Sequence, residues 1–381
     1  MEIERLRDWL AAALPDYLAD LERLVNIDCG SHLVGGVNQV GRWLAEQLRE
    51  LGAEVEVVPG RELGDTVVGR LAGDGRRILL IGHMDTVFPA GTAAARPFRV
   101  EGDRGLGPGA SDMKAGLLTG LYALRALRAT GTPIAAEIVF IANPDEELAS
   151  PESTPVIEHE ARGAHAALVL EGARANGDIV SSRKGVADIT VRLHGRAAHA
   201  GVEPEKGRNA IVEAAHKTLE LSALNGRWPG VTLNVGVISG GTRPNVVPEE
   251  AMLHIDLRAV EPATMALAEA EIELICATTT VPDVSCVVEK GARFGPMVRS
   301  AGTARLAEQA IALAVRLGFE LRDAATGGGS DAGTTSGLGV PTLDGLGPIG
   351  GLDHSPGEYV EIDSIVPRTA LLAALIATEG G

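Results

Sequence analysis

Short apolar runs alternate with stretches of helical periodicity through the first half of this chain. Apolar residues recur at helical spacing near the N-terminus, at residues 37–51 and at residues 113–129, which predicts helices there. Between and after these stretches, compact apolar runs predict strands that are buried in a sheet. Strands and helices that alternate in this way indicate an α/β domain. The predicted strands are residues 54–58, 66–71, 77–81, 135–142 and 166–170.

The strands at residues 66–71 and 77–81 are separated by a very short connection. Residues 72–75 read Ala-Gly-Asp-Gly, and glycine and aspartate tolerate the positive φ angles of a tight turn. We therefore expect these two strands to pair with each other as a β-hairpin.

The pattern changes after residue 185, where the predicted order becomes strand, helix, strand, strand, helix, strand. This βαββαβ order is that of a ferredoxin-like fold, which is a complete domain by itself. Alternation of helix and strand resumes afterwards and ends in a helix at residues 365–377. We therefore predict a discontinuous α/β domain with a mixed central sheet flanked by helices, formed by residues 1–184 and 294–381, and an inserted ferredoxin-like domain at residues 185–293.

Side chains that can bind a metal stand directly after three of the predicted strands. Open α/β sheets place their chemistry at the carboxyl ends of the strands. One histidine or acid at such a position could simply cap a loop, since loops are commonly acidic. Three strand ends equipped in the same way indicate a metal site instead. His83 and Asp85 follow the third strand, Glu146 and Glu147 the fourth, and Glu171 the fifth.

Composition and charge narrow the class of protein. Of the residues, 45% are hydrophobic, which excludes a disordered chain, and the net charge of −17 argues against nucleic-acid and anionic-membrane partners. The N-terminal segment lacks a basic region followed by an apolar one, and no later run is long enough to span a bilayer, so we expect a cytoplasmic protein. The three cysteines lack metal-ligand spacing and are expected to be reduced. Cysteine ligands are therefore excluded, and any metal in this protein must be bound by histidines and carboxylates.

The candidate ligands suit zinc, with Co²⁺ or Mn²⁺ as substitutes. The candidate ligands include two histidines, which is one histidine too few for two independent metal sites. If Asp112 bridges two ions through its two oxygens, each ion receives one histidine, one terminal carboxylate and the shared carboxylate. The candidates are His83, Asp112, Glu147, Glu171 and His354.

These motifs together resemble the M20 family of co-catalytic zinc peptidases and deacylases, most closely its glutamate carboxypeptidase-like branch. The resemblance covers essentially the whole chain. It rests on Gly-His-Met-Asp-Thr-Val at residues 82–87, Gly-Ala-Ser-Asp-Met-Lys-Ala-Gly at 109–116, Pro-Asp-Glu-Glu at 144–147, Gly-Arg-Ala-Ala-His-Ala-Gly at 195–201 and the late His354.

The resemblance implies a role for each residue of the metal site. One zinc would be held by His83, Asp112 and Glu171, and the other by Asp112, Glu147 and His354. Asp85 would orient the ring of His83, and Glu146 would be the general base. Many relatives carry aspartate where this chain has Glu171, and either carboxylate is an adequate ligand.

The inserted domain carries further residues that match the family. By the resemblance, His199 reaches the active site of the partner in a dimer and stabilises the oxyanion, while Asn245 and Arg258 bind substrate. An Arg258 fork would grip a substrate carboxylate, although a structural ion pair is the alternative. The glycine-rich loop with Gly328 and Gly329 would offer amides to the same anion or would be only a tight turn.

We therefore expect a homodimeric amidohydrolase with two zinc ions per chain. It would release a C-terminal, glutamate-like amino acid from a small N-acyl amino acid or a short peptide. An N-acyl amino-acid deacylase of the acetylornithine or succinyl-diaminopimelate type is the alternative within this class. A metal-binding partner protein without hydrolytic activity is an interpretation from another class, and Glu146 beside a complete ligand set speaks against it.

Overall fold

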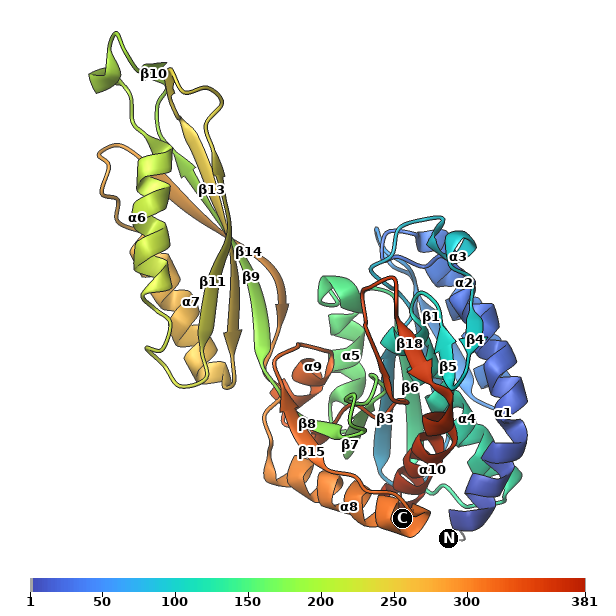
Figure 1. Cartoon of the computed structure of the whole chain (residues 1–381). Coiled ribbons are helices and arrows are strands. Elements are labelled where there is room, and N and C mark those ends of the chain that lie inside the picture. Colours follow the sequence, from blue (N-terminus) through green and yellow to red (C-terminus); the bar gives the residue numbers. More distant parts are fainter. Residues whose placement is uncertain (1–2, 381) are drawn as a thin grey trace. The chain divides into compact units, whose positions relative to one another are not determined.

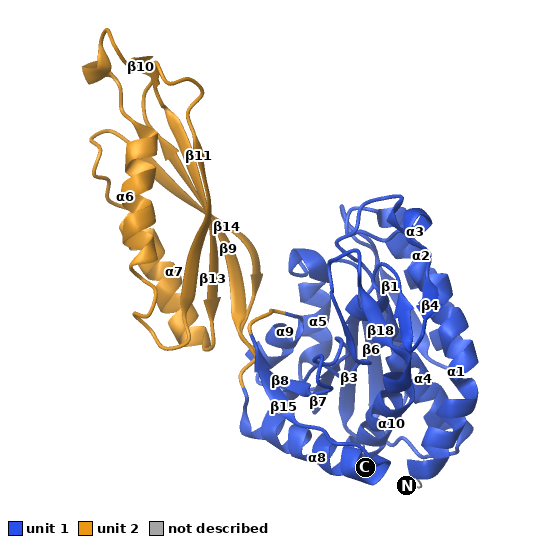
Figure 2. Cartoon of the chain, in the orientation of Figure 1, with its two compact units in different colours: residues 1–182, 299–326, 330–381 blue, residues 183–298, 327–329 orange. Residues whose placement is uncertain are grey.

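The computed structural model describes residues 3–380, and this part of the chain forms two compact units (Figure 2). Unit 1 consists of the chain up to Ser182, Arg299–Thr326, and the chain from Ser330 onward. Unit 2 consists of Arg183–Val298 and Gly327–Gly329. The division made from the sequence assigned residues 183–184, 294–298 and 327–329 to the larger domain, whereas in the structure they group with unit 2.

Unit 1 is built on a six-stranded mixed sheet, as predicted (Figure 1). Its central strand β3 (Arg77–His83) runs parallel to β6 (Glu137–Asn143) on one side and to β7 (Ala166–Val169) on the other. Every residue of β3 after the first is buried, as expected of a strand in the middle of a covered parallel sheet. The other strands are β2 (Thr66–Leu71) beside β6, β1 (Glu54–Val58) at one edge and β16 (Thr342–Leu343) at the other.

The prediction that β2 and β3 pair as a hairpin is wrong, because β6 lies between these two strands in the sheet. β6 runs antiparallel to β2 and parallel to β3. The turn contacts the chain that leads into β6 instead, and the amide of Gly75 donates to the carbonyl of Ala135 at 2.8 Å. A buried strand must pair its backbone groups on both sides. Long-range pairing of β3 with β6 and β7 therefore prevails over the local turn preference.

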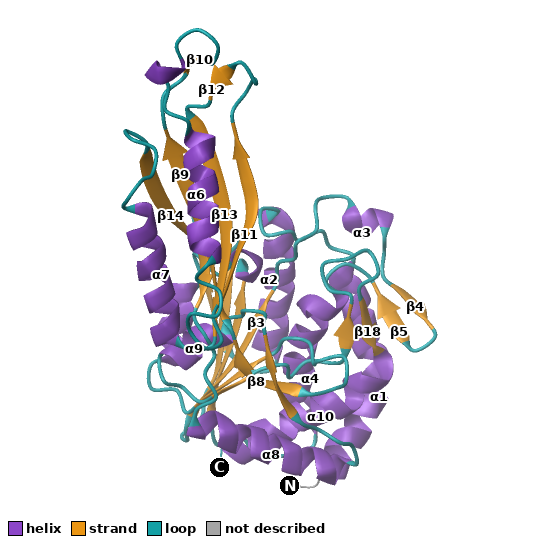
Figure 3. Ribbon diagram, turned by 60° about the vertical axis from the view of Figure 1, so that its left-hand side comes forward, coloured by secondary structure: helices purple, strands orange, loops and turns teal. Residues whose placement is uncertain are grey.

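Helices pack against this sheet and build the core of unit 1 (Figure 3). α4 (Ala115–Ala129), α10 (Ile362–Glu379) and α1 (Ile3–Val25) contact one another, because each presents an apolar stripe. The other helices of unit 1 are α2 (Val34–Glu50), which lies on β1 and β2, α8 (Ala301–Leu317), α5 (Thr154–Ala161), α9 (Ala332–Gly337) and α3 (Thr92–Ala95).

The start of α4 lies unusually close to the end of the sheet. A Cβ atom on Gly116 would be 1.9 Å from the carbonyl oxygen of Leu170, so only glycine fits at this position. This contact brings the segment that contains Asp112 next to the strand end that leads to Glu171.

Two small sheets complete unit 1. In the first, β5 (Arg104–Leu106) pairs with β18 (Tyr359–Glu361), so the chain segments on either side of these strands become neighbours. β5 precedes the segment with Asp112, and β18 follows the loop with His354. The remaining strands are β4 (Arg99–Glu101) and β17 (Gly350–Gly351) in this sheet, and β8 (Ile179–Arg183) with β15 (Asp323–Thr326) in the second.

Unit 2 has the βαββαβ order that the periodicity predicted. Its four-stranded antiparallel sheet has the order β11-β13-β9-β14, and alternate residues of β9 and β13 are buried against helices α6 and α7. In the described part of the chain, no helix combines the length and apolar character needed to cross a membrane. The elements of unit 2 are β9 (Gly185–His194), β10 (Ala198–His199), α6 (Ala210–Ser222), β11 (Thr232–Gly240), β12 (Val246–Val247), β13 (Glu250–Ala259), α7 (Pro262–Cys276) and β14 (Ser285–Phe294).

Candidate metal centre

Three parallel strands of unit 1 end next to one another, and the predicted ligands stand at these ends. β3 ends at His83, which is in register with Asn143 at the end of β6. Glu146 and Glu147 follow β6 within one turn, and Glu171 comes two residues after β7. Because parallel strands share a carboxyl edge, apolar runs of similar length deliver these side chains to one place.

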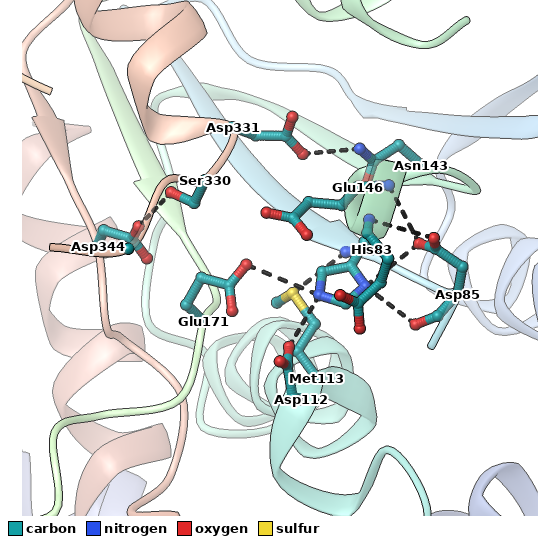
Figure 4. Close-up of polar contacts among 12 residues, drawn as sticks. His83, Asp85, Asp112, Met113, Asn143, Glu146, Glu171, Ser330, Asp331 and Asp344 are labelled. Carbon is teal, nitrogen blue, oxygen red and sulfur yellow. Dashed lines mark hydrogen bonds and ion pairs between the residues drawn. The ribbon is translucent and has the colours of Figure 1, made fainter. Parts of the chain in front are cut away.

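His83 is buried, and both of its ring nitrogens contact acidic residues. Nε2 lies 3.0 Å from Oδ1 of Asp112 and 3.7 Å from Oε1 of Glu171. Nδ1 lies 3.0 Å from the carbonyl oxygen of Asp85 and 3.3 Å from its carboxylate. Figure 4 shows Asp112, Glu146 and Glu171 approaching this ring from three different segments of the chain.

The second carboxylate oxygen of Asp112 faces the other predicted histidine. Oδ2 of Asp112 lies 3.0 Å from Nε2 of His354, and the same nitrogen lies 3.2 Å from Oε2 of Glu147. Asp112 therefore stands between two imidazole rings, with one oxygen toward each. His354 and Leu352 have positive φ angles of 61° and 58°, so the loop reaches this position through a backbone conformation that non-glycine residues rarely adopt.

Asp85 does more than orient His83. Its carboxylate is fully buried and accepts hydrogen bonds from the amides of Glu146 and Glu147, both at 3.2 Å. The hydroxyl of Ser31 donates to it at 2.6 Å. Asp85 thus connects the first histidine to the turn that carries the two glutamates, and the sequence interpretation missed both this connection and Ser31.

The donors present fit divalent cations. Two sets of ligand atoms lie within 4.8 Å of one another: His83 with Asp112 and Glu147, and His83 with Glu146 and Glu171. Oε1 of Glu147 is buried and has no hydrogen-bond partner, as expected of an oxygen reserved for a metal. Histidine nitrogens and carboxylate oxygens are ligands of zinc. The second set contains Glu146, so proximity alone does not separate a base from a ligand.

Charges in this cluster compensate one another through shifted pKa values. Burial lowers the pKa of His83, but hydrogen bonds to Asp112 and Asp85 outweigh burial and raise it well above its ordinary value. Hydrogen bonds to Asp112 and Glu147 raise the pKa of His354 to about 10. Burial also raises the pKa of Glu146. The carboxylates outnumber the histidines and stabilise positive charge in the site. A bound divalent cation would supply such charge.

Two further buried acids adjoin the cluster, and the sequence interpretation missed both. The carboxylate of Asp331 accepts hydrogen bonds from Asn143 at 2.7 Å and from Ser150 at 2.6 Å, next to the turn with Glu146. Glu358 is 1% exposed and accepts hydrogen bonds from backbone amides around Asp112. Burial raises the pKa of Glu358 to about 7, although these amides favour its charged form. The only sequence signals are that Asp331 follows the triple glycine and Glu358 closely follows His354.

Unit 2 carries His199 on a short two-stranded ladder, and Asn245 directly precedes the second strand of this ladder. β10 pairs with β12, so His199 lies opposite Val246, and the amide of Ala200 donates to the carbonyl of Asn245 at 3.1 Å. The His199 side chain is exposed, and its Nδ1 accepts a hydrogen bond from the amide of Gly201 at 3.1 Å. A neutral ring that accepts at Nδ1 carries its proton on Nε2, so His199 presents a hydrogen-bond donor.

Arg258, also in unit 2, makes the ion pair that was the alternative interpretation of this residue. Its guanidinium contacts the carboxylate of Asp256 through Nε and Nη2, both at 2.9 Å. Nη1 donates to the carbonyl of Gly327 at 2.7 Å. The carbonyls of Gly328 and Gly329 lie 3.4 and 3.5 Å from Nη1 of Arg183. The glycine-rich loop thus turns its carbonyls toward two arginines.

Comparison with known proteins agrees with this architecture. The family Peptidase family M20/M25/M40 matches residues 79–378. The chain is 33% identical over 375 residues to carboxypeptidase G2 of Pseudomonas sp. (strain RS-16). This alignment covers 96% of this chain and 90% of the relative. A stretch of 65 residues, 17% of this chain and 15% of the relative, is 46% identical to one component of the p-aminobenzoyl-glutamate hydrolase of Escherichia coli (strain K12).

The fold is also that of solved structures in this family. An M20 family metallo-carboxypeptidase from Sulfolobus solfataricus superposes with a TM-score of 0.77 and covers 96% of this chain and 99% of its own, at 17% sequence identity. At that identity the likeness shows the fold alone. The matches over the family region and to carboxypeptidase G2 confirm the resemblance seen in the sequence motifs. The chain therefore belongs to peptidase family M20/M25/M40, and it is a metallohydrolase.

Proposed function

We propose that this protein is a carboxypeptidase with two zinc ions that releases a glutamate-like amino acid from the C-terminus of an N-acyl or short-peptide substrate. The observation that carries the proposal is the placement of Asp112, whose two carboxylate oxygens each lie 3.0 Å from a different histidine nitrogen. One carboxylate in this position is able to serve two cations. His83 and Glu171 would complete one ligand set, and His354 and Glu147 the other.

Zinc ions in these ligand sets would polarise the scissile carbonyl and lower the pKa of a water molecule toward neutrality. Glu146 is buried beside His83 and Glu171, so its carboxylate would be within reach of such a water. It would take the proton of the attacking water and transfer it to the leaving amine. Asp85 supports both steps, because it holds the ring of His83 and the backbone of the turn that carries Glu146.

An acidic leaving amino acid is supported by the names of two relatives. One is a carboxypeptidase, and the other is named a hydrolase of p-aminobenzoyl-glutamate. Arg258 would anchor the carboxylate of that amino acid, and Asn245, Gly328 and Gly329 are the other residues that we propose to bind substrate. Asp256 holds one edge of the Arg258 guanidinium through Nε and Nη2, so the arginine is already oriented before a substrate arrives.

The function is tested by supplying a panel of substrates to the purified zinc-loaded protein. We expect p-aminobenzoyl-glutamate to be hydrolysed, and we expect a chelator to abolish the reaction and added zinc to restore it. Release of free glutamate is measured by chromatography. Preference for N-acetylornithine or N-succinyl-diaminopimelate would instead identify a deacylase, and absence of any chelator-sensitive hydrolysis would contradict the enzymatic proposal.

Arg258→Ala is expected to lower kcat/KM for p-aminobenzoyl-glutamate by roughly 10- to 150-fold. A hydrogen bond to a charged group contributes about 1.5–3 kcal/mol, which corresponds to that range. The matching substrate with its α-carboxylate converted to an amide should be poor for the wild type and lose little more on mutation.

The matched control for this prediction is Arg192→Ala, because Arg192 also forms an ion pair in the sheet of unit 2, with Glu289 at 2.9 Å. Arg192→Ala should leave kcat/KM unchanged. Equal losses on acid and amide substrates in the Arg258 variant would mean that Arg258 has only a structural role.

We also propose a cytoplasmic homodimer in which His199 acts on the active site of the partner. Two features support a donor role for His199: the side chain is exposed, and its Nδ1 accepts from Gly201, which leaves Nε2 to donate to an oxyanion. The three cysteines are free, which is typical of reducing compartments.

A mixed dimer tests the action of His199 in trans. A chain with His199→Ala is combined with a chain carrying Glu146→Gln, and heterodimers are isolated by two affinity tags. One of the two active sites in such a heterodimer should have both residues intact, so activity should return to about half of the wild-type value. Verified heterodimers that stay as inactive as the parent variants would show that His199 acts in its own chain, and a His199→Ala homodimer as active as wild type would show that His199 has no catalytic role.

A further inference from the structure

A buried glutamate outside the proposed ligand set lies against the segment that carries Asp112. Glu358 stands in the loop between β17 and β18, close after His354, and its side chain is almost completely inaccessible to solvent. Its Oε1 accepts hydrogen bonds from the amides of Ser111 at 2.9 Å and Asp112 at 3.1 Å. Its Oε2 accepts one from the amide of Gly109 at 3.1 Å. One carboxylate thus satisfies three backbone donors around the proposed bridging ligand.

The segment before α4 needs such an acceptor. Asp112 and Met113 have non-helical backbone angles, and Gly109 has a φ angle of 72°, so helix hydrogen bonds do not pair these amides. The first amides of any helix also lack partners within the helix. Buried amides without partners are costly, and so is a buried carboxylate without donors. Glu358 and the amides satisfy each other, and the position of the Asp112 backbone follows from that of Glu358.

The same glutamate belongs to the loop that carries the last histidine. The amide of Gly107 donates to the carbonyl of Glu358 at 3.2 Å, and the amide of Glu358 donates to the carbonyl of Ser355 at 3.3 Å. Main chain and side chain of Glu358 therefore both connect the loop of His354 to the segment of Asp112. The contact between Nε2 of His354 and Oδ2 of Asp112, at 3.0 Å, depends on the relative position of the two segments that carry these residues.

We propose that Glu358 is a positioning residue of the metal centre: it sets where the Asp112 carboxylate stands relative to His354, and thereby how tightly zinc is bound. This inference rests on the proposed function, because it takes Asp112 and His354 as ligands. Residues that support metal ligands typically change metal affinity by about 10–100-fold when they are replaced.

The test compares Glu358→Gln with wild type in the full-length protein. Glutamine has the same shape but puts an NH₂ group where one oxygen accepted, so at least one amide loses its acceptor. The dissociation constant for zinc alone is measured by competition with a chromophoric chelator, well below the unfolding temperature. We expect it to rise by about 10- to 100-fold, and an unchanged constant would overturn the inference.

Glu213→Gln is the matched control, because Glu213 is also buried and accepts hydrogen bonds from two backbone amides, those of Thr280 and Val281, but in unit 2. Both variants should unfold at a lower temperature than wild type, whereas only Glu358→Gln should bind zinc more weakly. An equal loss of zinc affinity in the two variants would assign Glu358 a general structural role and overturn the proposal.

Two further measurements keep the proposal testable. If circular dichroism shows that Glu358→Gln does not fold, Glu358→Asp is used, which retains the charge but withdraws it by one methylene group; weaker zinc binding in the folded variant supports the proposal, and unchanged binding overturns it. Zinc binding by wild type and His354→Ala is measured in parallel. Wild type that binds no zinc, or a His354→Ala variant that binds it normally, would refute the proposed metal centre itself, whereas normal wild-type binding with no effect of Glu358→Gln refutes only this inference.

Discussion

Glu146→Gln is expected to lower kcat by at least about 10²-fold while the protein keeps its fold and its zinc. Glutamine has the shape of glutamate but cannot accept the proton of the attacking water. Glu146 is buried next to His83, where the isosteric change introduces no steric conflict. Steady-state kinetics on p-aminobenzoyl-glutamate and elemental analysis of the same sample measure the two quantities.

Glu147→Gln is the control, since it changes the adjacent residue in the same turn. Oε2 of Glu147 lies 3.2 Å from His354, so its replacement should lower zinc content rather than only the rate. The proximity of Glu146 to the ligand atoms of His83 and Glu171 makes this comparison decisive. If Glu146→Gln lost zinc and Glu147→Gln kept it, the roles of base and ligand would be exchanged.

Asp112→Ala is expected to lose both zinc ions together and to reduce hydrolysis to the rate without enzyme. The reason is the shared geometry of its carboxylate, with one oxygen toward His83 and the other toward His354, so that one substitution removes a ligand from both sets. Wild type should contain two zinc ions per chain by elemental analysis, and Asp112→Ala should contain none after dialysis against metal-free buffer.

Glu171→Ala is the comparison that distinguishes a ligand shared by two ions, as proposed for Asp112, from a ligand of one ion. Oε1 of Glu171 lies 3.7 Å from Nε2 of His83, and Glu171 is proposed as a ligand of that ion alone, so this variant should weaken the binding of one ion and leave the other in place. Two zinc ions retained in active Asp112→Ala protein, or a single ion in fully active wild type, would contradict the bridged arrangement.

Local patterns in the sequence were sufficient for the main strands and helices and for the proposed ligands that follow strands. Apolar runs of strand length mark where β3, β6 and β7 stop, and a proposed ligand follows each run: His83 and Glu171 directly, and Glu147 a few residues after β6. The βαββαβ order of unit 2 follows in the same way, because the alternation of buried and exposed residues in β9 and β13 is a property of each strand alone. The pair Asp256 and Arg258 could also have been read from this alternation, since residues two apart on a strand share a face.

Only the tertiary structure decided which strands and loops become neighbours. The insertion of β6 between β2 and β3, against a favourable turn sequence, depends on pairing energies of strands far apart in the chain.

The contacts that support the proposed metal centre are equally non-local: Ser31 donates to Asp85 across 54 residues, and Glu358 accepts from Asp112 across 246. A single serine or glutamate in a loop has no periodicity that reveals such a contact. The sequence by itself therefore determined which side chain stands at the end of each strand, because that depends on local hydrophobicity. Packing of the whole chain determined which buried amides needed an acceptor and which residue supplied it, because only folding brings those groups together and removes water from them.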